Sequence, residues 1–226
     1  MNGPVVLHGT SSAVNRVEGE IFKWENVRVS VRDMTFVNTS FFLNDLHQGS
    51  FRDCLFVNCE ISLLSPWDCF FENTEHVRNV AGKLPVSVRS RPDRQANNLR
   101  FSHARFENNN GPSVNLRGPN FRKVMVDDCK FHSLKGGAAD TVHLRCELVS
   151  GLSVVNCTNF TSGSQVPFHV GMELVSCTDW FVENTTEFES LDVGCRVGGR
   201  RLGRREFAGF SPHNRPCRHL LLVEGK

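Results

Sequence analysis

The sequence contains no tyrosine, although 18 of its 226 residues are phenylalanine. Tyrosine carries a polar tip that suits wet surfaces, so its absence indicates that aromatic rings fill a buried core. No run of 18 apolar residues occurs, which argues against a membrane-spanning helix. Residues 1–8 lack a basic region followed by an apolar stretch. We therefore expect no secretory signal peptide.

The nine cysteines include no Cys-x-x-Cys pair of the kind that metal and redox sites commonly use. Without a signal peptide, this pattern predicts reduced thiols in an intracellular protein. Cys195, Cys217, His213 and His219 stand near one another, but their spacing matches no known zinc finger. We expect no metal and no other cofactor.

The net charge is only +2, so the chain as a whole is not a polyanion binder. Seven arginines nevertheless gather near its end: Arg196, Arg200, Arg201, Arg204, Arg205, Arg215 and Arg218. We interpret this cluster as a solvated tail or a dock for an acidic protein surface, rather than a nucleic-acid site. Gly198-Gly199 lies in no phosphate-binding pattern.

A short pattern recurs along the chain: a polar residue, then a small residue that is often cysteine, then an aromatic residue. Copies stand at 33–36, 53–56, 68–71, 103–106, 128–131, 156–160 and 176–180. The aromatic residue closes each copy, so the intervals between the rings are unequal. Such an irregular period of about two dozen residues is typical of stacked coils joined by loops of variable length.

The segments before these copies alternate with period two, as in Val27, Val29 and Val31. This alternation predicts strands with one buried face. The sequence therefore predicts an all-β protein, a right-handed parallel β-helix of about seven coils, in which like residues stack. An antiparallel sandwich would not repeat one tetrapeptide at one place in each unit, and a leucine-rich repeat would need regular leucines.

Three regions follow from this prediction. Residues 1–26 form an N-terminal coil or cap, residues 27–194 the β-helix body, and residues 195–226 an arginine-rich segment whose apolar end, 219–223, forms a strand. Because the ends of such a stack carry unpaired backbone groups, we expect oligomerisation. The expected core ladder consists of Phe36, Cys54, Phe56, Cys69, Phe71, Phe106, Cys129, Phe131, Cys157, Phe160, Cys177 and Trp180.

Four carboxylates occupy the same place in the pattern, Asp33, Asp53, Asp68 and Asp128, and could line one face. Glycosidases need two carboxyl groups across a cleft. Acidic residues at a fixed turn position more often bond the local backbone, and the chain has only three tryptophans for stacking on sugars. The cysteines at the buried places of the repeat are not expected to be nucleophiles. We therefore predict no enzymatic activity and no catalytic residue.

Some segments resemble a known family. Residues 54–59, Cys-Leu-Phe-Val-Asn-Cys, followed by Leu63-Leu64, and residues 76–81 resemble parts of the large early-region-1B protein of adenoviruses. Near the end, Trp180, the segment 195–200, Arg215-Pro216 and the segment 219–223 follow the order of the family's C-terminus. The chain is shorter than a full member, and Val197 stands where relatives often have cysteine.

The resemblance implies a structural virion protein. The family includes left-hand-end proteins of atadenoviruses, which resemble phage tailspikes, form trimeric knobs on the capsid and clamp neighbouring hexons. By this resemblance we expect a cementing protein on the virion surface, present in the host nucleus during assembly. Its expected partners are hexon and the other chains of a homotrimer or of a mixed trimer with a longer β-helical relative, without membrane or nucleic acid. A nuclear regulatory adaptor that binds host proteins and a tailspike-like glycan hydrolase are the alternatives.

Overall fold

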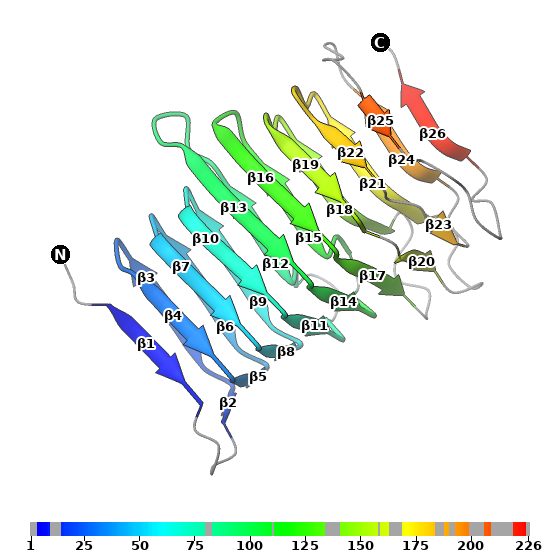
Figure 1. Ribbon diagram of the computed structural model, residues 1–226. Coiled ribbons are helices and arrows are strands. Elements are labelled where there is room, and N and C mark those ends of the chain that lie inside the picture. The colour runs from blue at the N-terminus through cyan, green and yellow to red at the C-terminus, as the bar shows by residue number, and fades with distance from the viewer. Residues whose placement is uncertain are drawn as a thin grey trace.

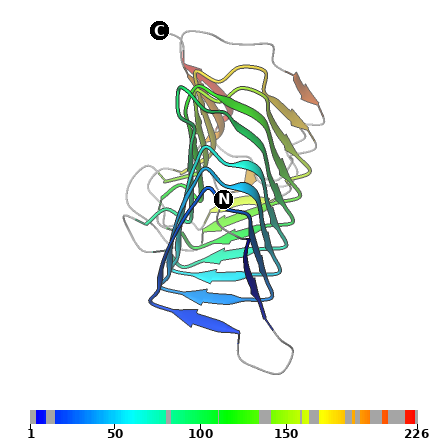
Figure 2. The ribbon, with the colours of Figure 1, turned by 90° about the vertical axis from the view of Figure 1, so that its left-hand side faces the viewer.

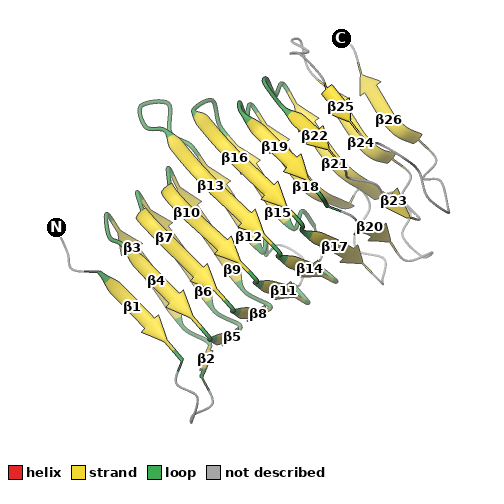
Figure 3. Ribbon diagram, viewed as in Figure 1, coloured by secondary structure: helices red, strands yellow, loops and turns green. Residues whose placement is uncertain are grey.

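The computed structural model describes residues 4–9, 15–79, 83–109, 111–133, 141–157, 159–162, 169–183, 188–189, 193–198, 206–208 and 219–224. Within these ranges the chain forms strands and no helix (Figure 3). The strands belong to three sheets, and every pairing between named strands is parallel (Figure 1). The predicted all-β class and parallel pairing are therefore confirmed, which rules out the antiparallel sandwich.

Sheet A has nine strands, in the order β1 (Val5–His8), β4 (Val29–Arg32), β7 (His47–Arg52), β10 (Trp67–Glu72), β13 (Ala96–Ser102), β16 (Phe121–Asp127), β19 (Leu152–Val155), β22 (Phe181–Glu183) and β25 (Glu206–Ala208). Sheet B has eight, β2 (Arg16–Glu18), β5 (Thr35–Val37), β8 (Leu55–Val57), β11 (Glu75–Val77), β14 (Arg105–Glu107), β17 (Lys130–Ser133), β20 (Asn159–Ser162) and β23 (Phe188–Glu189).

Sheet C has nine strands, β3 (Ile21–Glu25), β6 (Ser40–Asn44), β9 (Glu60–Leu64), β12 (Val86–Arg89), β15 (Val114–Arg117), β18 (Thr141–Glu147), β21 (His169–Val175), β24 (Val193–Gly198) and β26 (His219–Glu224). From β1 to β24 the chain visits A, B and C in turn, and each strand pairs with the third strand after it, as β1 pairs with β4 (Figure 1). After β24, the described strands are β25 in sheet A and β26 in sheet C. One passage through the three sheets is called a coil below. Viewed from the N-terminal end, successive coils lie one behind another (Figure 2).

The number of coils exceeds the seven that the aromatic pattern predicted. Strands β1, β2 and β3 already form a complete coil inside residues 4–26, and they pair with β4, β5 and β6. Its place in the aromatic row is taken by Val17, which pairs with Phe36. Counting aromatic residues missed this coil because an aliphatic side chain fills the same inward position. At the other end, β26 pairs with β24 and extends sheet C.

The inward faces of the three sheets share one apolar core. Phe51 of sheet A and Phe41 of sheet C both contact Phe56 of sheet B, with ring centroids 6.3 and 6.0 Å apart. The alternating residues Val29 and Val31 are buried, as their period-two spacing predicted. Polar residues alternate with them on the outer face, so each strand buries one side only.

Tight corners join the sheets, and they use backbone with positive φ. At the corner between sheets A and B these residues are Asp33, Asp53, Asn73, His103, Asp128 and Asn156, with φ between 48° and 54°. Asn and Asp adopt this left-handed region more readily than other non-glycine residues. The recurring Asp before the small residue therefore reflects a conformational requirement of the corner.

We expect the substitution Phe56→Ala to lower the free energy of unfolding by about 3–5 kcal/mol, because it leaves a cavity between neighbouring rings. Phe56 is 1% exposed and stacks on Phe36 at 5.3 Å. Phe42→Ala is the matched control, since Phe42 is 37% exposed on the outer face of sheet C. Urea unfolding followed by circular dichroism measures both. Equal losses in the two variants would contradict the buried stack.

Candidate functional site: the stacked interior and its corners

The aromatic row of sheet B runs through consecutive coils in register. Five predicted ladder residues occupy this row: Phe36, Phe56, Phe106, Phe131 and Phe160. The rings of Phe106 and Phe131 are stacked at 5.0 Å, with planes 7° apart. Phe160 is placed by its backbone pairing with Phe131, and its side chain lies outside the described residues.

His76 fills the place in this row between Phe56 and Phe106. Its imidazole is stacked between the two rings, at centroid distances of 4.8 and 4.7 Å. Complete burial lowers the pKa of His76 from 6.5 to about 3, because the interior disfavours the charged form. The Thr74 hydroxyl lies 3.2 Å from its Nε2 atom, so the neutral ring keeps a hydrogen-bond partner.

His76 was missed from the sequence because the copy at 68–71 was taken for this coil. That copy belongs to sheet A: Phe71 pairs with Phe51 and Phe101, and Cys69 pairs with Gly49 and Leu99. Both placements correct the prediction that the cysteine and the ring of every copy stack on those of the copy before. The spacing Cys-x-aromatic arises on any inward face with period two, so it does not identify the sheet. The equal spacing of Phe36, Phe56 and His76 along the chain was the signal that could have identified it.

The small residues of the pattern occupy corners. At the corner between sheets A and B, successive coils place Cys54, Thr74 and Ala104 at the same position. The backbone carbonyl of each accepts a hydrogen bond from a backbone N–H of the next coil. Cys129 and Cys157 lie at the same corner in later coils, and all these residues are buried. The corner leaves room only for a small side chain, which explains the recurrent cysteine.

Two predicted ladder members lie elsewhere. Cys177 follows β21 at the corner between sheets C and A, where its thiol donates to the Cys146 carbonyl at 3.3 Å. Trp180 comes immediately before β22 and is buried beside sheet A. The predicted residues thus belong to five rows: one along sheet B, two along sheet A and two at corners. Sheet A has two because Cys69 pairs with Leu99, whereas Phe71 pairs with Phe101. The error arose because the copy at 176–180 was read as equivalent to the copy at 156–160, although it lies at the next corner of the coil.

Corner thiols donate hydrogen bonds to the carbonyl two residues earlier. Cys59 donates to Val57 at 3.3 Å, just as the Thr39 hydroxyl donates to Val37 at 3.0 Å. Burial raises the pKa of the corner thiols of Cys54 and Cys177 to about 11. Thiols held in the protonated form are poor nucleophiles. Their geometry fits a packing and capping role.

The corner between sheets B and C carries a second polar feature inside the protein. The amide of Asn109 donates to the His76 carbonyl at 3.1 Å, and its oxygen accepts from the Asn79 backbone at 3.2 Å. Asn79 in turn donates to the carbonyl of Cys59. Buried amides of this kind must be hydrogen-bonded, so this row fixes the stacking of three coils. The interval of 20 residues between Cys59 and Asn79, the same as between Phe56 and His76, was the sequence signal for this row.

The candidate carboxylates do not form one row. Asp33 and Asp53 lie at the corner between sheets A and B in successive coils, and Arg32 Nε lies 3.3 and 3.5 Å from them. Asn73 donates to Asp53 at 2.7 Å. Asp68 lies at the start of β10 instead, where Asn98 donates to it at 2.8 Å. Its assignment with the others is therefore wrong. The contacts of Asp53 and Asp68 tie one coil to the next, whereas Asp33 contacts its chain neighbour Arg32.

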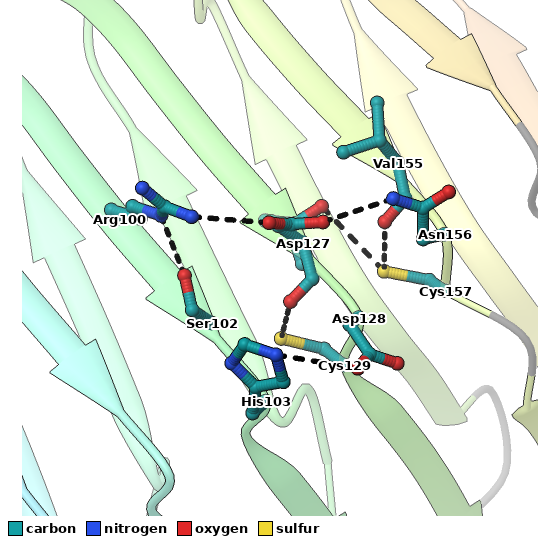
Figure 4. Close-up of polar contacts among 10 residues, drawn as sticks. Arg100, Ser102, His103, Asp127, Asp128, Cys129, Val155, Asn156 and Cys157 are labelled. Atoms are coloured by element: carbon teal, nitrogen blue, oxygen red, sulfur yellow. Dashed lines mark hydrogen bonds and ion pairs between the residues drawn. The ribbon is translucent and has the colours of Figure 1, made fainter.

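Asp128 belongs to the outer corner network in Figure 4. His103 Nε2 lies 3.5 Å from its carboxylate, and both side chains are about half exposed. The neighbouring Asp127 accepts from Arg100 at 3.1 Å and from Asn156 at 3.2 Å, so it bridges the coils on either side. Each carboxylate here has a partner in an adjacent coil, which gives the network a role in holding coils together.

The arginine-rich end is described only in part. Arg196 in β24 pairs with Glu173 of β21, and Arg145 of β18 reaches the same carboxylate at 3.1 Å. This ion-pair group again spans three coils. The other arginines of the cluster, with His213 and Cys217, lie outside the described residues. Within the described ranges, no three His, Cys, Asp or Glu side chains gather as a metal site would require.

We expect the stability of the protein to fall as the pH decreases from about 6.5 towards 3, because unfolded His76 binds a proton that the folded form excludes. In that interval, this residue changes the free energy of unfolding by at most about 1.4 kcal/mol per pH unit. The substitution His76→Phe should remove this contribution and keep the stack. His103→Asn, at an exposed corner, is the control. Urea unfolding between pH 4 and 7 measures the slopes, and the same slope in His76→Phe and wild type would refute the assignment.

The described residues contain no helix with the length and apolarity that a membrane crossing requires. Comparisons with protein-family models, with curated proteins and with solved structures find no match to this chain. The functional conclusion below therefore draws on the stacked sheets, on their contacts and on the sequence resemblance described above.

Proposed function

We propose that the three sheets close into a right-handed, tailspike-like parallel β-helix that acts as a non-enzymatic structural protein of an adenovirus-type capsid. In this role it sits on the virion surface and stabilises contacts between hexons. The observation that carries the proposal is the register of the coils. Strands of sheet C continue in parallel pairing from β3 to β26, without an interruption in the order of the sheet.

Stiffness is the property that a brace between capsomers needs. Each coil is joined to the next by backbone hydrogen bonds in three sheets, and by side chains that stack in rows. Ion pairs across coils add to this, as between Arg52 of β7 and Glu72 of β10 at 3.1 Å. A column with hydrogen bonds along its whole length resists bending, because any bend must lengthen bonds in at least one sheet.

The trimer is supported by an apolar strip on the outer face of sheet B. Val37, Val57 and Val77 are paired in successive strands and are partly exposed, and Leu55 lies beside them. This row gives a short apolar surface across three strands, with Glu18 and Glu107 paired at its two ends. We propose that it packs against equivalent surfaces of two further chains, either copies of this chain or a longer relative.

Two of the segments that resemble the early-region-1B family lie in the strands and corners of the coils. Residues 54–59 pass from one corner through β8 to the next, with Cys54 and Cys59 buried at the two corners. Residues 219–223 lie in β26, the last strand of sheet C. These placements support a shared coil architecture, and with it the capsid role that the family resemblance implies. Nuclear presence during assembly follows from where such capsids are built.

The first test is the composition of the virion. We expect mass spectrometry of purified particles of the virus that encodes this chain to detect it in a fixed ratio to hexon. Purified chain should also bind isolated hexon. Presence in infected nuclei but absence from particles would favour the regulatory adaptor and overturn the capsid role. Cleavage of glycans that is lost in an Asp53→Asn variant would favour the hydrolase.

The second test concerns the strip on sheet B. We expect Val57→Asp to convert a trimer into monomers, because three buried carboxylates would meet without partners. Ser50→Asp, on the outer face of sheet A, is the matched control and should leave the trimer intact. Light scattering after size-exclusion chromatography gives the molar mass of the wild type and of both variants. Each is measured alone and in a mixture with a longer relative. A wild-type chain that stays monomeric in both cases would contradict the trimer.

A further inference from the structure

A pocket of about 400 Å³ lies at the corner between sheets C and A, away from the sheet B strip. It spans several coils, with Asp45 and Ser65 from the corner, His47 and Trp67 from β7 and β10, and Arg94 from the segment before β13. The amide side chains of Asn26 and Gln95 complete its wall. This volume is within the range of small-ligand sites.

Asp45 is the unusual residue of this pocket. It is only 5% exposed, and its Oδ2 atom lies 2.8 Å from Arg94 and 3.4 Å from Arg91. Its other oxygen, Oδ1, is buried and has no hydrogen-bond partner among the described residues. A buried carboxylate oxygen without a donor is costly, so the site favours a molecule that supplies one.

The wall above Asp45 is built to stay in place. The backbone N–H of Arg91 donates to Ser65 Oγ at 3.0 Å, and the amide of Asn120 donates to the Arg91 carbonyl at 3.0 Å. The Arg94 guanidinium is less restrained than this turn, because the Arg94 side chain is 52% exposed. A ligand that displaced this exposed guanidinium would reach the carboxylate, while the hydrogen bonds of Arg91 hold the turn in position.

Trp67 supplies an apolar surface at the same pocket. It is 40% exposed, whereas Trp180 is 2% exposed and Trp24 is packed against the core. Trp67 pairs in register with His47 on the outer face of sheet A, which places a second ring beside it. An exposed indole next to hydrogen-bonding groups offers a flat apolar face on which part of a ligand can stack.

The charges of the pocket indicate the class of that molecule. Two guanidinium groups already face the single carboxylate, so a cationic ligand would meet an excess of positive charge. An anionic ligand would have to approach the buried Asp45 carboxylate. A neutral molecule with several hydroxyl groups avoids both penalties, since a hydroxyl can donate to Asp45 and accept from Arg94.

We propose that this pocket binds a neutral saccharide, with one sugar ring stacked on Trp67 and a hydroxyl donating to Asp45. The C–H face of a pyranose matches an indole, and its hydroxyls match the amides and the carboxylate around it. The small number of tryptophans disfavoured a sugar-binding surface at the level of sequence, but one exposed tryptophan at a polar pocket is enough for a single ring. The site is independent of the capsid role and of the trimer.

The test uses the full chain and defined sugars. Saturation-transfer NMR and tryptophan fluorescence are recorded with lactose, maltose and diacetylchitobiose, and with glucosamine and galacturonate as cationic and anionic probes. We expect at least one neutral disaccharide to bind with a Kd on the order of 1 mM. The two charged sugars should bind at least tenfold more weakly. No response to any neutral sugar, or a stronger response to a charged one, would overturn the proposal.

Variants then locate the site. Trp67→Ala and Asp45→Asn should each weaken binding of that disaccharide at least tenfold, while Phe42→Ala and Asp68→Asn should leave it unchanged. Gln95→Ala leaves the Arg94–Asp45 contact in place and should weaken binding severalfold, which keeps the test valid if Asp45→Asn perturbs the turn. Circular dichroism verifies the fold of each variant. Binding that survives Trp67→Ala would show that the sugar sits elsewhere and would refute the site.

Discussion

The stacking of coils at the spacing of neighbouring parallel strands, about 4.8 Å, is the constraint on which the rest of this protein depends. At that distance, side chains at equivalent positions in successive coils are in contact. Each position therefore accepts only side chains that pack well against a similar side chain. Flat rings satisfy this on sheet B, as Phe106 on Phe131 illustrates. Small side chains satisfy it at the corners, where Cys54, Thr74 and Ala104 follow one another. The absence of tyrosine fits the same constraint, because a hydroxyl inside this row would need a partner in every coil.

The polar residues obey the constraint in two ways. Inside, His76 and Asn109 are accepted because each finds its hydrogen-bond partners within the neighbouring coils. Outside, carboxylates and guanidinium groups alternate between coils, as Arg52 and Glu72 do. Surface ion pairs of this kind contribute little one by one. Their effect here is on register, since a coil shifted by one residue would turn its apolar face outward and separate every pair at once.

Much of the architecture could be predicted from the sequence, because period-two alternation and a recurring Asp are direct consequences of strands and corners. The buried residues Val29 and Val31 follow from alternation alone. Phe71, Cys69, Cys177 and Trp180 were placed in the wrong rows, because a cysteine two residues before a ring occurs on more than one face of a coil. His76 had one sequence signal, its equal spacing from Phe36 and Phe56. Asp45 had none, since its role depends on which coils lie above and below it and not on its neighbours in the chain.

The early coils are regular in a way that bears on how such a protein can change in evolution. Val29, Gly49 and Cys69 are paired in sheet A, and Thr35, Leu55 and Glu75 in sheet B, with one constant interval along the chain. Each of these coils thus has the same length, and its first and last residues occupy the same structural positions as those of the next coil. Duplication of one such segment would add one coil to the stack, and deletion would remove one. In either case the residues at the two new junctions would match those of the existing coils. The number of coils in such a protein can therefore change during evolution without a change of fold.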